Sequence, residues 1–393
     1  MSGRRLWSVG VVLAAALAPG LARGGDWAED VAAARRLLEQ APAGADAHAA
    51  IDLLNLALTQ PVPPLKRPEI YYWLGRAWFL SKDAPKAIEA FRQALAGDPT
   101  SPLYKLWLGA AWAFDGRSTP AVRLLRDVYG DPATAAPERQ AAGDALTQLH
   151  EPPDAERLVP PVALTSEGMV IRANAGQPFV ADVREAIAEA RRRLRDRLGL
   201  TPQAVVEVLV FADARSYQAY HAERQMPRPE WSTSCEGHGR IYTYPAAQSH
   251  DAAVSTRDAL ISTLTHEYTH FALHAEAADR PLPCWLDEGL AVLISNQFPD
   301  ARRLVSQARA LLSLPALSVS SFSVYGTADA RLAYAQSKSM AEFMLDTSGP
   351  AALRTYLRDL AGEDPADAVF TRNFGLTPEQ FFGRWLAERA NGG

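Results

Sequence analysis

Hydrophobic residues recur every three to four positions along most of this chain, which places them on one face of a helix. Two stretches break the pattern: Val205 to Phe211 is apolar except for Glu207, and Arg240 to Tyr244 alternates. The first is typical of a buried strand and the second of an edge strand. A further strand is expected over 168–173. Helices are expected over 31–40, 48–59, 68–132, 137–149, 179–198, 213–223, 256–276 and 301–389. The chain is therefore predicted to be α+β, with an all-α N-terminal part.

The N-terminal helical part contains an internal repeat. Gly75 and Gly109 are 34 residues apart (109 − 75), and Trp78 and Trp112 follow them at the same offset. Small residues let paired helices approach closely, and large side chains fill the space beside them. This period resembles that of tetratricopeptide repeats. The resemblance is specific over 68–132 and predicts a short solenoid with a degenerate first repeat and a closing helix.

Such repeats often bind a peptide or a partner protein in a concave groove. Tyr72, Arg76 and Phe79 are candidates for that surface. The alternative is that the module only packs against the rest of the chain, and the sequence does not choose between the two.

The candidate chemistry is concentrated in the predicted helix 256–276. His266 and His270 lie one turn apart on the same face, so their imidazoles can bind one Zn²⁺ ion. Glu267 follows the first histidine, where a metalloprotease helix carries its general base. A catalytic zinc site needs a third protein ligand and leaves one position for water. The pattern also fits a core helix with two surface histidines, so a second motif has to support it.

That second motif is the run Trp285 to Gly289. An HExxH helix followed by Trp-Leu-x-Glu-Gly resembles the gluzincin metallopeptidases, in particular their peptidase MA-like branch. The resemblance covers about residues 165–390 and implies a zincin-like domain with Glu288 as the third zinc ligand. It also implies that the strand 240–244 lies beside the zinc helix and pairs with the substrate backbone; the alternative is a plain hairpin. The separation of 18 residues (288 − 270) is one shorter than in aminopeptidase members, so the connecting loop differs.

The resemblance assigns a role to each site residue. Zinc held by His266, His270 and Glu288 would lower the pKa of a bound water to about 7 and polarise the scissile carbonyl. Glu267 would accept the proton of that water and deliver it to the departing amine.

Hydrolysis also needs a donor for the oxyanion. The family places a tyrosine in a helix after the ligands, which makes Tyr334 the candidate and Tyr325 the reserve; a structural tyrosine is the alternative. His274 continues the histidine face but lies too far away to share the metal. Some gluzincins orient a zinc histidine with an acidic residue four positions after the glutamate, where this chain has Val292. The orienting residue is therefore not identified by the sequence.

Composition adds the cellular context. The formal charge of −5 gives no general attraction to nucleic acid, and the arginines between 184 and 197 fit the solvated face of an amphipathic helix. Arg4 and Arg5 before the apolar run 6–17 predict a signal peptide over 1–24, with an uncleaved anchor as the alternative. No membrane span is expected after its removal. We expect an exported protein, periplasmic or secreted, of bacterial type. The two cysteines, Cys235 and Cys284, either form a disulfide or remain buried thiols.

The predicted organisation is a signal peptide (1–24), a tetratricopeptide module (25–150), a proline-rich linker (151–163) and a gluzincin-like peptidase domain (164–393). The predicted function is an exported zinc peptidase acting on a peptide or protein. One alternative is an interaction protein whose zinc site is structural or lapsed. Another is a zinc hydrolase of a cell-wall amide. Glu267 favours an enzyme, because a purely structural site does not need it.

Overall fold

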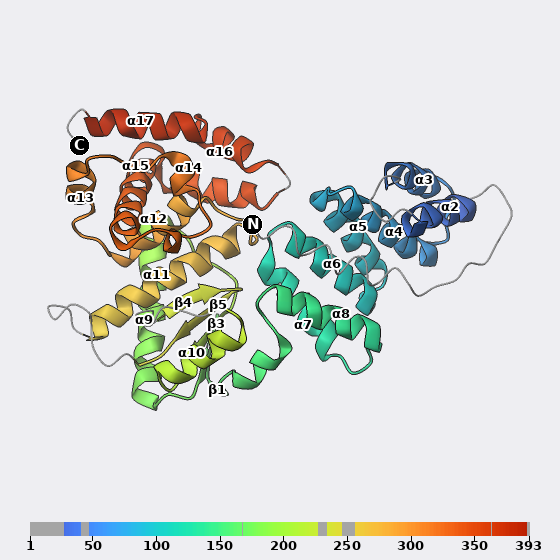
Figure 1. Cartoon of the computed structure of the whole chain (residues 1–393), viewed down its shortest axis with the longest axis horizontal. Helices are drawn as coiled ribbons and strands as arrows, with labels where there is room; N and C mark the ends of the chain where they lie inside the picture. The colour runs from blue at the N-terminus through green and yellow to red at the C-terminus, as the bar shows by residue number, and fades with distance from the viewer. Residues whose placement is uncertain are drawn as a thin grey trace. The chain divides into compact units, whose positions relative to one another are not determined.

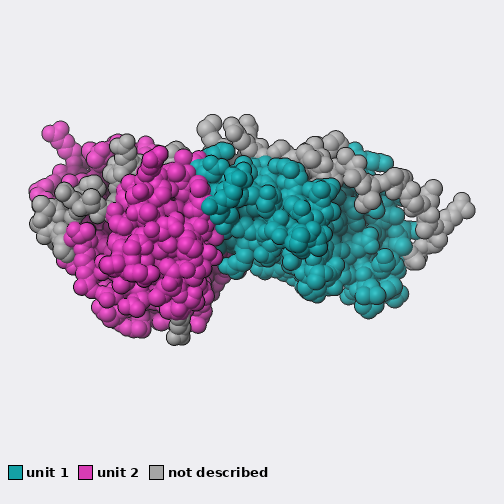
Figure 2. All heavy atoms as spheres, turned by 90° about the horizontal axis from the view of Figure 1, so that it is seen from below, with its two compact units in different colours: residues 1–157, 223–226 teal, residues 158–222, 227–393 magenta. Residues whose placement is uncertain are grey.

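A computed structural model describes residues 27–40, 47–166, 168–226, 234–245, 256–362 and 364–390. The predicted signal peptide, 1–24, lies outside these ranges. The chain divides into two compact units, drawn in different colours in Figure 2. The first comprises residues 1–157 and 223–226, and the second comprises 158–222 and 227–393.

The first unit is helical (Figure 1). Each helix packs on the next along the chain, and alternate helices also touch, as in stacked helix pairs. The helices are α2 (Trp27–Gln40), α3 (Ala47–Thr59), α4 (Arg67–Leu80), α5 (Ala84–Gly97), α6 (Pro102–Phe114), α7 (Ser118–Gly130) and α8 (Ala136–Gln148), with short 3-10 turns η2 (Pro64–Lys66) and η3 (Pro153–Leu158).

The two repeated glycines occupy equivalent close contacts. A Cβ atom on Gly75 would lie 2.6 Å from the ring of Phe91, so α4 and α5 can approach only because residue 75 has no side chain. A Cβ on Gly109 would lie 3.0 Å from Leu125, across the contact between α6 and α7. The 34-residue spacing thus marks the same packing arrangement in two consecutive helix pairs.

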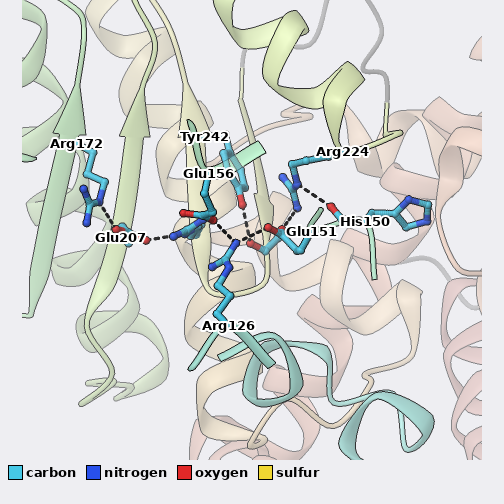
Figure 3. A network of polar contacts seen from close by, with 10 residues as sticks. Arg126, His150, Glu151, Glu156, Arg172, Glu207, Arg224 and Tyr242 are labelled. Atoms are coloured by element: carbon cyan, nitrogen blue, oxygen red, sulfur yellow. Dashed lines mark hydrogen bonds and ion pairs between the residues drawn. The ribbon is translucent and has the colours of Figure 1, made fainter. Parts of the chain in front are cut away.

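Part of the segment predicted as a linker is buried. Glu151 forms an ion pair with Arg224, which follows α10 (Ala214–Glu223) along the chain and groups with the first unit (Figure 3). Arg224 also donates from Nε to the carbonyl of His150 at 3.0 Å. Arg126 lies 2.5 Å from a carboxylate oxygen of Glu151 and 2.5 Å from one of Glu156. These pairings stabilise charges that would be costly to bury alone.

The second unit contains a mixed sheet of β1 (Val162–Ser166), β2 (Met169–Ala173), β3 (Val206–Val210), β4 (Ser234–Gly237) and β5 (Arg240–Thr243). The strand order is β1-β2-β3-β5-β4. Strands β2, β3 and β5 are parallel, while β1 and β4 pair antiparallel with β2 and β5.

The prediction that 240–244 forms the edge strand is wrong. This segment is β5, which lies between β3 and β4, and all four of its residues are buried. Arg240 produced the polar alternation, but its guanidinium is paired at 2.6 Å with Glu207 of β3, which also binds Arg172 (Figure 3). In the sequence, the buried and ion-paired Arg240 therefore had the same pattern as a residue that faces solvent. The edge beyond β5 belongs to β4.

Helices surround this sheet and share one core with it. They are α9 (Gln177–Leu198), α11 (Thr256–Glu276), α12 (Cys284–Ser295), α13 (Ala301–Gln307), α14 (Leu314–Leu317), α15 (Thr327–Leu360), α16 (Ala366–Phe374) and α17 (Pro378–Ala390), with a 3-10 turn η4 (Phe322–Val324). Gly199 follows α9 in the left-handed conformation (φ 65°), which glycine adopts readily at the end of a helix. Within the described ranges, no helix is both long and apolar enough to span a membrane.

Candidate metal centre

The orientation of α11 is fixed by packing on both sides. Leu264, Tyr268 and Phe271 are buried, and the helix contacts α9, β4 and α12 (Figure 1). The Tyr268 hydroxyl accepts a hydrogen bond of 3.1 Å from Nε of Arg191 in α9. The opposite face of α11 carries His266 and His270 side by side, with their rings 4.8 Å apart.

Three potential ligand atoms converge beside this face. Nε2 of His266 and Nε2 of His270 are 3.1 Å apart. Oε2 of Glu288 lies 3.3 Å from the first and 3.6 Å from the second. Ligands of a tetrahedral zinc ion, bound at about 2.0–2.1 Å, lie about 3.3–3.4 Å from one another. The three residues proposed from the sequence are therefore brought together at the separation that one such ion requires.

The surroundings of Glu288 fit a cation. Its Oε2 atom is buried and accepts no hydrogen bond from the described residues, although it lies between two imidazole nitrogens. Burial opposes ionisation of this carboxyl, but His266 and His270 lower its pKa to about 2. A buried carboxylate whose free oxygen faces two ring nitrogens is costly unless a positive charge binds there. Two imidazoles and one carboxylate form a donor set that suits zinc.

The position of Glu288 on α12 is fixed by the contacts of two other residues of that helix, Trp285 and Gly289. Trp285 is buried and stacks on Phe381 of α17, with ring centroids 5.5 Å apart. On the other side, a Cβ atom on Gly289 would lie 2.3 Å from the backbone carbonyl of Ser337 in α15. The tryptophan and the glycine of the motif thus fix how closely α12 packs, and with it the position of the glutamate between them.

Asp287 supplies the partner that the sequence did not identify. Its Oδ1 lies 2.8 Å from Nδ1 of His270, and its Oδ2 lies 3.1 Å from Nε2 of His274. Burial opposes its ionisation, but the two histidines hold its pKa well below the usual range. A carboxylate on the second ring nitrogen fixes the orientation of a metal-binding histidine. The signal in the sequence was the acidic residue directly before Glu288, which the motif leaves variable.

Glu267 lies in the same acidic, histidine-lined region. Burial raises the pKa of its carboxyl; His266 and His270 oppose this rise, while the charges of Glu288 and Glu236 add to it. A partly buried carboxyl whose pKa is raised is suited to exchanging protons.

Tyr334 and Tyr325, the two candidates for the oxyanion donor, have different surroundings in the structure. Tyr334 packs between Phe298 and Phe322, with ring centroids 5.6 and 5.2 Å away. Burial, followed by the charge of Glu288, raises the pKa of its hydroxyl, so Tyr334 lies within electrostatic range of the site. Tyr325 instead donates its hydroxyl proton to the carbonyl of Ala316.

Both cysteines are free thiols, so the disulfide alternative is not found. The sulfur of Cys235 lies 3.4 Å from the hydroxyl of Tyr217 and 3.6 Å from Nε2 of His221. Burial, with the nearby Glu288 carboxylate, raises the pKa of the Cys284 thiol to about 12. Cys284, the first residue of α12, therefore stays protonated.

A separate cleft of about 1490 Å³ lies along α9 and the first turns of α11, and residues 295–300 also line it. None of the five predicted site residues lines it. Its acidic and basic side chains pair with each other, as Arg257 does with Glu185. The convergent ligand atoms, and not this cleft, mark the candidate centre.

Two imidazoles and a carboxylate around one point, with the partly buried Glu267 in the same region, are an arrangement typical of metal-dependent hydrolases. The sequence profile of the Peptidase MA superfamily matches residues 188–388, just over half of the chain. The chain belongs to this superfamily, whose members are typically metal-dependent, and carries a zincin-like peptidase domain. A search of curated proteins found no match.

Proposed function

We propose that this protein is a zinc-dependent peptidase of the gluzincin type. The observation that carries the proposal is the convergence of His266, His270 and Glu288, whose ligand atoms lie 3.1–3.6 Å from one another. The buried Glu288 oxygen that accepts no hydrogen bond supports a cation at this point. Structural zinc sites hold four protein ligands, whereas the described residues offer three here, so a catalytic site is favoured over a structural one.

The residues around the proposed zinc site have different roles in hydrolysis. Zinc, when bound, supplies a Lewis acid that polarises the substrate carbonyl and acidifies water. Glu267 takes the proton of the attacking water and passes it to the departing amine, for which its raised pKa is suited. The Tyr334 hydroxyl, kept protonated by its raised pKa, donates to the carbonyl oxygen as negative charge develops. Asp287 holds the ring of His270 in place.

The substrate is an extended peptide that adds to the edge of the sheet. Strand β4 is the last strand in the order β1-β2-β3-β5-β4, and it contacts α11. An edge strand beside a catalytic helix can bind peptide backbone by hydrogen bonding, independently of side-chain sequence. This assigns to β4 the role that the sequence had given to 240–244.

The N-terminal helices are proposed to be a tetratricopeptide module that docks substrate or a partner protein. The close contacts at Gly75 and Gly109, one repeat apart, support this assignment. We further propose that the module spans 25–150, that 151–163 links it to the peptidase domain at 164–393, and that the signal peptide directs the protein to the periplasm or the medium.

The test is Glu267→Gln, measured for zinc content and for turnover of a quenched-fluorescent peptide library. The variant is expected to keep one zinc per chain and to lose about 10²–10⁴-fold in turnover, the range for removal of a general base. Glu276→Gln, on the same helix, is the matched control and is expected to retain turnover. Wild-type turnover in Glu267→Gln would overturn the mechanism, and a wild-type protein without zinc would overturn the proposed site.

A further inference from the structure

His274 lies between two carboxylates that come from different elements. Its Nε2 is 3.1 Å from Oδ2 of Asp287 in α12, and its Nδ1 is 3.4 Å from Oε2 of Glu236 in β4. The Glu236 side chain is 9% exposed, and its other oxygen accepts a hydrogen bond of 3.1 Å from the backbone N–H of Gly239. Both ring nitrogens of His274 therefore face an acceptor that is itself held in place.

This arrangement continues a chain of contacts from the metal centre. His270 directs Nε2 towards Glu288 and Nδ1 towards Asp287, and Asp287 uses its second oxygen for His274. The contacts thus run from His270 through Asp287 and His274 to Glu236, from the ligand face of α11 to the edge strand.

A second metal ion explains these contacts less well. His270, His274 and Asp287 lie close enough together to hold an ion. However, an imidazole presents only one nitrogen to a given ion, and His274 has a carboxylate at each nitrogen. A ring that bridges two carboxylates by hydrogen bonds accounts for both contacts at once.

We propose that His274 is a positioning residue that Glu236 anchors to the edge strand, and that it fixes Asp287 and through it the metal ligand His270. The proposal rests on the metal site assigned above. It adds that the strand offered to the substrate and the ligand of the metal are joined by one hydrogen-bonded path. Without His274, one oxygen of the partly buried Asp287 would lose its partner, and the carboxylate would be free to turn away from His270.

The test compares zinc binding by the full chain and its variants. His274→Phe keeps a planar ring but removes both donors, and His274→Gln restores one. Zinc dissociation constants are measured by competition with a chromophoric chelator. His274→Phe is expected to weaken zinc binding about 10–100-fold, the range for loss of a residue that orients a metal ligand. His274→Gln is expected to recover part of the loss, and Glu276→Gln, two residues further along α11, to bind as the wild type does.

A second measurement separates positioning from a general effect on folding. The visible absorption of the cobalt-substituted protein reports ligand geometry, and it is expected to change in His274→Phe while the melting temperature of the metal-free protein is retained. If His274→Phe does not fold, Glu236→Gln, which preserves side-chain volume, takes its place and is expected to weaken zinc binding several-fold. Unchanged zinc affinity and cobalt spectrum in the folded variants would overturn the inference. Absence of zinc from the wild type would instead overturn the proposed function.

Discussion

Replacing Gly289 with alanine, which adds one methyl group, is expected to displace the adjacent Glu288 and so to weaken the metal centre, although residue 289 is not itself a ligand. A Cβ atom at this position would lie 2.3 Å from the carbonyl oxygen of Ser337 and 3.2 Å from Cβ of Ala341. Ordinary contact begins at 3.4 Å, so in Gly289→Ala the two helices must separate by about 1.1 Å (3.4 − 2.3). The clash is with backbone, and no rotamer change can relieve it. Overpacking of this kind costs about 1–3 kcal/mol of stability.

The same separation of the helices also moves Glu288, the proposed ligand next to Gly289. Metal sites tolerate deviations of about 0.2 Å in ligand distance, so a shift of about 1 Å in the backbone carrying Glu288 exceeds the tolerance. We expect Gly289→Ala to weaken zinc binding about 10–100-fold, as do other changes that misplace a ligand. The assay is chelator competition on the purified variant, together with thermal denaturation of the metal-free and metal-loaded protein.

The matched control is Gly383→Ala in α17, where an added Cβ would meet nothing within 4 Å. That variant is expected to bind zinc normally and to gain up to about 1 kcal/mol, because alanine favours a helix over glycine. Wild-type zinc affinity and stability in Gly289→Ala would refute the argument that the close approach of α12 to α15 sets the position of Glu288.

Three further outcomes are expected. Tyr334→Phe should retain zinc and lose about 10²–10³-fold in kcat, the range for one oxyanion donor, whereas Tyr325→Phe should keep its activity; equal kcat values would remove Tyr334 from the mechanism. Gly75→Ala should lower the melting temperature of the helical unit, at a cost of about 1–3 kcal/mol, while Gly130→Ala, with open space around it, should not; equal melting would contradict the packing argument. Burial opposes ionisation of Glu207, but Arg240 and Arg172 lower its pKa below the unfolded value of about 4.3. The ionised carboxylate therefore adds to the free energy of unfolding above that pH, and this stabilisation is lost as pH falls through the folded pKa. Glu207→Gln should therefore be less stable than the wild type at pH 7, with a difference that shrinks in acid; urea denaturation at both pH values checks this.

The sequence predicted the features whose signal is local. The histidine pair, the Trp-Leu-Asp-Glu-Gly run and the buried strand that became β3 each follow from spacing within one element. Strand β4 does not, because Ser234–Gly237 has neither alternation nor strong strand formers, and its extended state comes from pairing with β5. The edge of the sheet was misassigned for the same reason: the partner that buries Arg240 lies more than 30 positions earlier in the chain.

Asp287 shows most clearly what only the structure could supply. Consecutive residues on a helix point about 100° apart, so Asp287 and Glu288 leave α12 in different directions. The angle between α11 and α12 brings both back to one ring, where Asp287 meets Nδ1 of His270 and Glu288 faces Nε2. One turn of helix thus provides a proposed metal ligand and the residue that orients another proposed ligand. A motif can mark the first by its spacing, but the second depends on how two helices cross, and that crossing is set by Gly289 and Trp285 through contacts with α15 and α17.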